Sequence, residues 1–419
     1  MIEKIARIFK NVDDWIIIYE KQKVKQIKFA NSKIVINQFW DFEVLTLFLA
    51  KGKKTFLSSL TISSEKDANT FARNCLKKVK NVEENKNYFG IAEGKFNYRS
   101  PIYDKKVFEY DWNERIEKVL DDLKQKSAGT FWEGKIEREI LTSKRINEKD
   151  INTFFNFSIR TFGKTSFHSA KYSTFGKNIE IEKIAEEAKH YSNLTDRKMN
   201  VKEKKYPILF LPLALSGILS YASLAFSALE VISGNSFLIN KIGKEISSKN
   251  LTLIDDGTFR KFDDEGRPTK RTILIDNGIL KSYLHNTSTS KQTNQKPTGN
   301  AGIVYPIPWE IEVKNGEYSF EEMLENIKEG LIVSNTWYTR FTSFVEGSFS
   351  SLARDAIFYV KNGKIEGIAK NVRINSNFLD FLKNIEAIEK RKEEVKWWES
   401  IIPVKTPAIL IKNILVTRP

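Results

Sequence analysis

The sequence predicts an α+β protein: a duplicated helix–strands–helix region followed by a mainly antiparallel β domain with a few packed helices. Two observations predict this class. The same order of amphipathic helix, strands, hairpin and helix occurs twice in the first half, and Asn-Gly dipeptides separate apolar runs in the second. Asn-Gly favours a tight β-hairpin because a type I′ turn needs positive φ at both central residues. We therefore expect a duplicated α/β domain over residues 1–195 and a mainly β domain over residues 206–419.

The two repeated units follow one plan. The first opens with the amphipathic segment IEKIARIFK, turns at residues 51–53 and closes on the helix EKDANTFARNCLKKV. The second opens with NERIEKVLDDLKQK, turns at Gly163-Lys164 and closes on IEIEKIAEEAKHY. Its opening helix has four apolar residues on one face: Ile116, Val119, Leu120 and Leu123. The polar run at 193–206 then predicts a domain boundary.

Three hairpins are expected in the second half. They turn at Asn277-Gly278, Asn315-Gly316 and Asn362-Gly363, each between apolar runs. These turns predict an antiparallel sheet region.

Two helices are expected to interrupt this sheet. The first, SFEEMLENIKEG, has a capping box of Ser319 and Glu322 and ends at Gly330. The second, NFLDFLKNIEAIEKR, carries four apolar residues at helical spacing: Phe378, Leu382, Ile385 and Ile388.

An uncharged stretch begins the second domain, from Tyr206 to Leu229. Its length would allow a membrane span. However, Pro207 and Pro212 interrupt the first turns of such a helix, and serines recur along the stretch. We expect a strand at ILFLP and then a buried, Ala/Ser-rich helix, with no membrane partner.

Composition limits the function further. Net charge is +15, from 68 Lys+Arg and 53 Asp+Glu, but the lysines alternate with glutamates instead of forming a stripe. We therefore expect no specific nucleic-acid partner. Cys75 is the single cysteine, so the chain can form neither an internal disulfide nor a cysteine-based zinc site. The opening residues lack the pattern of a signal peptide, which predicts a cytoplasmic protein.

Four segments in the second domain carry a family resemblance. They are Asp255–Thr258, Asp263–Gly266, Thr272–His285 and Thr298–Ala301, which contain Asp-Asp-x-Thr, Asp-x-Glu-Gly, a hairpin ending in Tyr-Leu-His, and Thr-Gly-Asn-Ala. In this order they resemble the TldD/TldE family, also called PmbA, of metallopeptidase-related proteins. The match is specific over residues 205–302 and looser afterwards, and the duplicated first half also fits the family.

The resemblance points to the TldE-like arm of that family. The catalytic arm, TldD, has a His-Glu-x-x-His helix just before these segments and a cysteine ligand near its C-terminus. Here the corresponding LPLALSGILSYAS has no histidine or carboxylate, and the C-terminal neighbourhood has Trp397 and Trp398 but no cysteine. The resemblance implies a chain with no catalytic residue, metal ligand or cofactor of its own. Its partner would be a TldD-like zinc peptidase subunit, and the pair would degrade unfolded polypeptides and peptides.

Five residues are candidates for contact with a peptide in the cavity of such a complex: Thr298, Gly299, Asn300, Ala301 and His285. Glycine permits close backbone approach, and the Asn300 amide offers both a donor and an acceptor. An ordinary turn and a structural histidine are the alternatives. Two other functions stay open: a self-sufficient hydrolase with unusual ligands, and a basic nucleic-acid or gyrase-associated protein.

Overall fold

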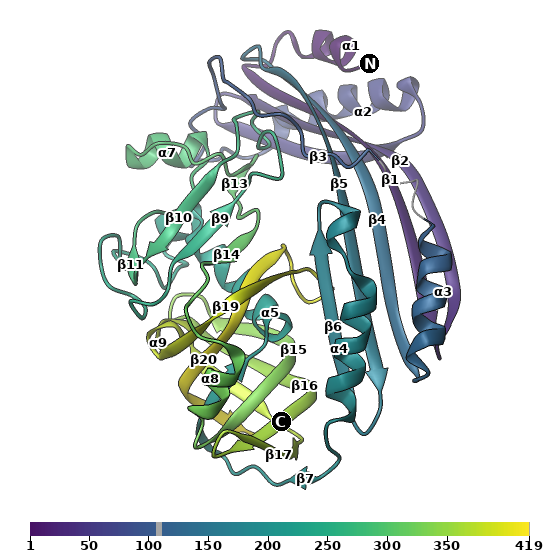
Figure 1. Cartoon of the computed structure of the whole chain (residues 1–419). Helices are drawn as coiled ribbons and strands as arrows, with labels where there is room; N and C mark the ends of the chain where they lie inside the picture. Colours follow the sequence, from purple (N-terminus) through teal and green to yellow (C-terminus); the bar gives the residue numbers. More distant parts are fainter. Residues whose placement is uncertain (106–110, 419) are drawn as a thin grey trace.

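The computed structural model describes residues 1–105 and 111–418 (Figure 1). In this part of the chain, the first half forms a six-stranded antiparallel sheet in the order β3-β2-β1-β4-β5-β6. Its elements are α1 (Ile2–Ala6), β1 (Asp14–Ala30), β2 (Lys33–Lys51), β3 (Lys54–Ile62), α2 (Glu65–Lys78), α3 (Trp112–Leu123), β4 (Ser127–Thr142), β5 (Asn147–Phe162), β6 (Ser166–Ser173) and α4 (Ile181–Asn193).

The duplication is visible in the order of the strands. β1 and β4 pair at the centre of the sheet, and each unit continues outward through two more strands and ends on a helix. The expected turns after Lys51 and Phe162 are both present. The predicted α+β class and the duplicated plan are therefore confirmed.

The two faces of this sheet have different coverings. On β5, Phe155, Phe157 and Ile159 are buried in a core shared with α3 and α4. The alternate residues Ser158 and Arg160 point the other way, because successive side chains of a strand lie on opposite faces. That second face turns toward the C-terminal half, and β6 is in contact with β15, β16 and β19 (Figure 1). We call this boundary the seam.

The second half is built on a mixed sheet, twelve-stranded within the described residues, in which β20 pairs with β8, β14, β18 and β19. Its elements are β7 (Lys198–Met199), β8 (Lys204–Phe210), α5 (Pro212–Ala222), α6 (Ala228–Ile232), β9 (Leu253–Asp256), β10 (Arg271–Asp276), β11 (Ile279–Leu280), α7 (Thr287–Thr293), β12 (Ala301–Gly302), β13 (Tyr305–Pro306), β14 (Ile311–Val313), α8 (Phe320–Glu325), β15 (Glu329–Ser343), β16 (Ser348–Lys361), β17 (Lys364–Ala369), β18 (Arg373–Asn377), α9 (Phe378–Lys383), β19 (Ile385–Val395) and β20 (Val404–Thr417).

The uncharged stretch forms β8 and then α5, as expected from its sequence. Nearly every residue of α5 is buried. Within the described residues, no helix has the length and apolarity that crossing a membrane requires.

Two of the three expected Asn-Gly hairpins are present. Asn277-Gly278 and Asn362-Gly363 have positive φ at both residues, as a type I′ turn requires. The prediction for Asn315-Gly316 was wrong, because β14 ends at Val313 and the chain continues into α8. Gly316 instead lies against the backbone of β19, where a Cβ would be 2.0 Å from the Ile388 carbonyl oxygen.

The two helix predictions in this region need correction. The capping box of Ser319 and Glu322 is present, but α8 ends at Glu325, before Gly330. The later helix ends at Lys383, and the residues from Ile385 onward form β19 instead. Helical spacing of the apolar residues was misleading here, because pairing with β20 gives the segment a strand conformation.

Candidate functional site

Helix α5 occupies the place where the resemblance puts the ligand helix of the catalytic arm. Pro212 stands at its start, where the missing N–H costs no hydrogen bond. Small residues let it pack closely on β15 and β20. The hydroxyls of Ser216 and Ser220 donate to the carbonyl oxygens of Leu213 and Gly217, at 2.8 and 3.0 Å. These bonds satisfy the buried serines within the helix.

The chain after β19 returns to this helix. Trp397 Nε1 and Ser400 Oγ each donate to Ser216 Oγ at 3.0 Å. Glu399 packs beside Gly217, where an added Cβ would be 3.3 Å from the Glu399 Cγ. The fold therefore joins the two segments that, by the family resemblance, hold the zinc ligands in the catalytic arm.

The groups present do not fit zinc. Among the described residues, no three His, Cys, Asp or Glu side chains gather as a metal site. Ser216 Oγ donates once and accepts twice, so its hydrogen-bonding capacity is used within the chain. Its proton is donated to the Leu213 carbonyl oxygen, so the hydroxyl serves the packing of α5 and is not poised as a nucleophile.

Glu399 is a buried carboxylate beside Gly217 of α5, and no sequence pattern indicated it. Its side chain is buried, and its Oε1 accepts the Thr339 backbone N–H at 2.7 Å. Burial raises the pKa of Glu399, while the bond from Thr339 and the charge of Arg340 partly oppose the rise. The side chain therefore ties β15 to the segment beside α5.

A cavity of about 650 Å³ opens in the seam beside Trp397 and Trp398, which precede Glu399 in the chain. The sheet and the segment before β20 both contribute aromatic lining residues: Trp132, Phe154, Tyr172, Trp397 and Trp398. Apolar walls with a few polar groups are typical of ligand pockets. We call this space the aromatic cavity.

Exposed rings continue outward from the aromatic cavity. Trp398 is 63% exposed, and its ring centroid lies 5.4 Å from that of Trp337 and 6.4 Å from that of Tyr338. Tyr338 has a left-handed φ of 52° at an irregularity in the pairing of β15 with β16. Left-handed backbone at a bulky residue is strained, and such strain concentrates at functional sites.

Ser158 lines the same cavity and pairs with His168. His168 Nε2 lies 2.7 Å from Ser158 Oγ. His168 Nδ1 faces two donors, Asn335 Nδ2 at 3.3 Å and Arg160 Nη2 at 3.5 Å. Nδ1 must therefore accept, and the ring proton lies on Nε2, which donates to Ser158.

This tautomer is the wrong one for activating a serine. A general base needs a free Nε2 lone pair directed at the hydroxyl. Burial and the positive charge of Arg160 also lower the pKa of His168 to about 3, so the ring is neutral. The pair thus fixes the seam structurally, and it lends no support to a self-sufficient hydrolase.

The five residues predicted from the sequence come together in another part of the second domain. Thr298 Oγ1 accepts the His285 backbone N–H at 2.8 Å, so the loop and the hairpin end do meet. Asn300 is fully buried and donates to Asp255 and to the Ile307 carbonyl oxygen, at 2.6 and 3.0 Å. Burial lowers the pKa of His285 to about 4.

The other two residues of the loop are also engaged within the chain. Gly299 has a φ of 77° and accepts from Trp309 Nε1 at 2.8 Å. The Ala301 N–H donates to Asp263, whose pKa burial raises to about 7. Hydrogen bonds to Asp255, Asp263 and Trp309 fix the loop within this chain. Its contact with a peptide stays a prediction.

The sequence matches a family model over more than half of the chain. Residues 203–418 match the PmbA/TldA metallopeptidase C-terminal domain. The chain therefore belongs to the TldD/TldE family of metallopeptidase-related proteins, as the motifs indicated.

Individual relatives agree with this assignment. An uncharacterized protein of Methanocaldococcus jannaschii is 28% identical over 344 residues, which cover 75% of this chain and 79% of that protein. The metalloprotease PmbA of Escherichia coli is 29% identical over 203 residues, covering 47% and 43%. The match thus spans under half of that metalloprotease. The crystal structure of TldE from Thermococcus kodakarensis has the same fold, with a TM-score of 0.87, 19% identity and 99% coverage of both chains.

Proposed function

We propose that this chain is the non-catalytic, TldE-like subunit of a zinc peptidase complex that acts on unfolded polypeptides and peptides. One observation carries the proposal: α5 and the Trp397–Ser400 segment meet, but with Ser216 and Trp397 at the contact instead of metal ligands. A TldD-like partner would supply the zinc and the general base.

The aromatic cavity suggests what this chain supplies to the pair. Its tryptophan and tyrosine walls offer large apolar contact without selecting one side chain, which suits unfolded polypeptides of varied sequence. The strained Tyr338 and the exposed Trp398 would hold the substrate at the mouth of the cavity.

The test is reconstitution with a TldD-like subunit from the same cells. We expect a stable complex that cleaves an unfolded protein, loses activity to a chelator, and contains zinc that this chain alone does not retain. This chain alone should cleave nothing. Cleavage by the isolated chain with stoichiometric zinc, or a partner that is fully active while the two never assemble, would contradict the proposal.

A paired set of variants separates assembly from substrate use. Trp398→Ala removes an exposed ring at the cavity mouth and should lower cleavage by the complex several-fold while leaving assembly intact. Phe39→Ala, an exposed ring on β2 with similar exposure, serves as the matched control and should change neither.

A further inference from the structure

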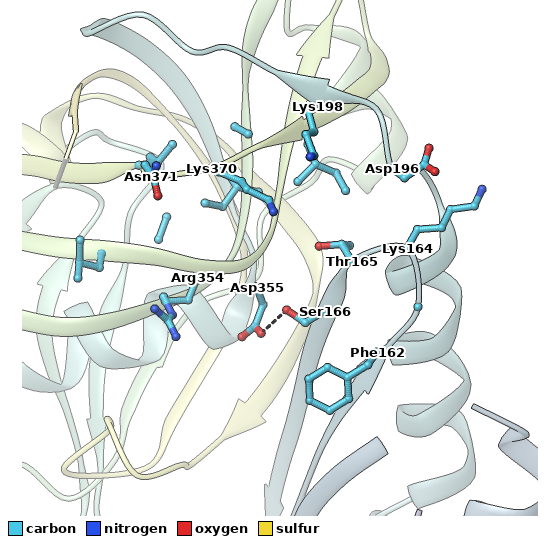
Figure 2. Close-up of a pocket in the computed structure, with 17 residues that line it drawn as sticks. Phe162, Lys164, Thr165, Ser166, Asp196, Lys198, Arg354, Asp355, Lys370 and Asn371 are labelled. Carbon is cyan, nitrogen blue, oxygen red and sulfur yellow. Dashed lines mark hydrogen bonds between the residues drawn. The ribbon is translucent and has the colours of Figure 1, made fainter. Parts of the chain in front are cut away.

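A second cleft lies at the other end of the seam, with a volume of about 720 Å³ (Figure 2). One wall runs from Phe162 at the end of β5 through the β5–β6 turn to Ser166 at the start of β6. The other is formed by residues of β7, β16 and β17 and by the turn after β17. Nothing in the proposed function requires this space. We call it the cationic cleft.

Cations predominate around the cationic cleft. Its lining includes four basic side chains, all exposed: Lys164, Lys198, Arg354 and Lys370. Within the described residues, no ion pair to any of these four is found, although Arg354 also stacks over the Trp337 ring at 4.2 Å. Figure 2 shows the Lys370 and Lys198 side chains directed into the space between the walls.

Two acidic residues also line the cleft, Asp196 and Asp355, so four cations face one exposed carboxylate, Asp196, and one that is already paired, Asp355. Arg160 pairs with Asp355 at 2.8 Å, and Asn335 and Ser166 donate to it at 2.8 and 2.9 Å. Burial would raise the pKa of Asp355, but the charge of Arg160 and the hydrogen bonds lower it overall, so the carboxylate is ionised and its oxygens are already bonded. The Ser166 bond also ties the two walls together (Figure 2).

Apolar groups line the rest of the cationic cleft. Ile357, Ile368 and Val372 contribute from the C-terminal half, and Phe162, which is 41% exposed, contributes from the end of β5. A site with basic side chains beside an apolar floor fits a carboxylate attached to a hydrophobic group better than it fits a bare inorganic anion.

From this geometry we infer that the cationic cleft binds the C-terminal carboxylate of a peptide that ends in a hydrophobic residue. Lys370 and Lys198 hold the carboxylate, and the terminal side chain lies against Phe162 and Ile357. Trp337 connects the two sites, because it contacts Trp398 at the aromatic cavity and Arg354 at the cationic cleft. The inference rests on the proposed function for its ligand class, the peptide.

The test measures binding to the isolated full-length chain by fluorescence anisotropy. The probe is a labelled hexapeptide ending in leucine, either with a free carboxylate or as the C-terminal amide. We expect the carboxylate to bind about tenfold more tightly, since a charge-assisted hydrogen bond is lost in the amide. Lys370→Glu should remove this preference, and raised salt should weaken it.

Lys364→Glu is the matched control, because Lys364 is an exposed lysine of β17 outside the cleft lining and the change in charge is the same. It should alter affinity less than twofold. Equal binding of carboxylate and amide, an unchanged preference in Lys370→Glu, or inorganic phosphate competing as well as the peptide would overturn the inference. The peptide-binding test uses this chain without its partner. A failure of the two subunits to assemble would therefore contradict the proposed function and leave this inference standing.

Discussion

Trp397 and Trp398 are neighbours in the sequence with opposite environments. Trp397 is 6% exposed and donates to Ser216, whereas Trp398 is 63% exposed and its ring lies beside those of Trp337, Tyr338 and Trp397. The difference follows from the chain direction after β19, where alternate side chains point toward α5 and away from it. One ring therefore stabilises the fold, and the other is free to contact a ligand.

This difference predicts unequal costs of truncation. Trp397→Ala removes a buried ring and leaves Ser216 without one donor, so it should lower the free energy of unfolding by about 3–5 kcal/mol. Trp398→Ala should lower it by less than about 1 kcal/mol. Urea unfolding followed by far-UV circular dichroism measures both, and equal losses would contradict the assignment.

A half-buried carboxylate of α4 predicts a dependence of stability on pH. Burial, together with the charge of Glu393, raises the pKa of Glu187 to about 7, although a bond from Ser169 opposes the rise. The folded state then binds this proton more tightly than the unfolded state. The stabilising contribution is complete below about pH 4 and is lost as the pH rises through 7.

Glu187→Gln should therefore stabilise the protein more at pH 8 than at pH 5, by about 2 kcal/mol. Glu186→Gln is the control, because Glu186 is the exposed neighbour on the same helix. Its effect should not vary between the two pH values. The measurement is the urea midpoint of each variant at both values, and an equal gain at pH 5 and pH 8 for Glu187→Gln would refute the prediction.

At the scale of elements, the sequence predicted what depends on local geometry. The helices α2, α3 and α4, the strand–helix pair β8–α5 and two Asn-Gly hairpins follow from periodicity, caps and turn residues. The prediction of a hairpin at Asn315-Gly316 failed because this Asn-Gly dipeptide packs against β19 and forms no hairpin turn. Its glycine is needed for close approach to Ile388, a contact 72 residues away that no local pattern reveals.

Two glycines test this explanation. Gly316→Ala brings a Cβ to 2.0 Å from a carbonyl oxygen, so the backbone of β14–α8 or β19 must shift. We expect a loss of more than about 2 kcal/mol, as for other overpacked sites. Gly52→Ala meets nothing within 4 Å and suffers only its φ of 58°, which costs about 1 kcal/mol. Thermal unfolding compares them, and a smaller loss at Gly316 would show that the close approach does not require glycine.

At the scale of the whole molecule, the seam could not be predicted from the sequence. Trp397 meets Ser216 across 181 residues, and Asn335 meets His168 across 167. Sequence motifs identified the Thr298–Ala301 loop, whose groups are used in holding the second domain together. The aromatic cavity and the cationic cleft arise from residues with no spacing pattern, since the two halves of the chain contribute them separately.

The net charge of +15 is also a property of the whole molecule, and it predicts weak binding to nucleic acid. Many of the basic side chains are paired with carboxylates across strands and helices, as Lys23 is with Asp41 and Arg115 with Glu182. Scattered cations bind phosphates without reading sequence, and their affinity falls steeply with salt because binding releases counterions.

We therefore expect duplex DNA to bind at 50 mM salt and to be released at 200 mM, with no preference among sequences. Polyglutamate serves as the control, and it should compete with DNA because scattered lysines attract any polyanion. Anisotropy titrations over that salt range measure both ligands. Sequence-selective binding that persists at 200 mM would move the nucleic-acid alternative ahead of the peptidase-subunit proposal, since scattered lysines cannot produce it.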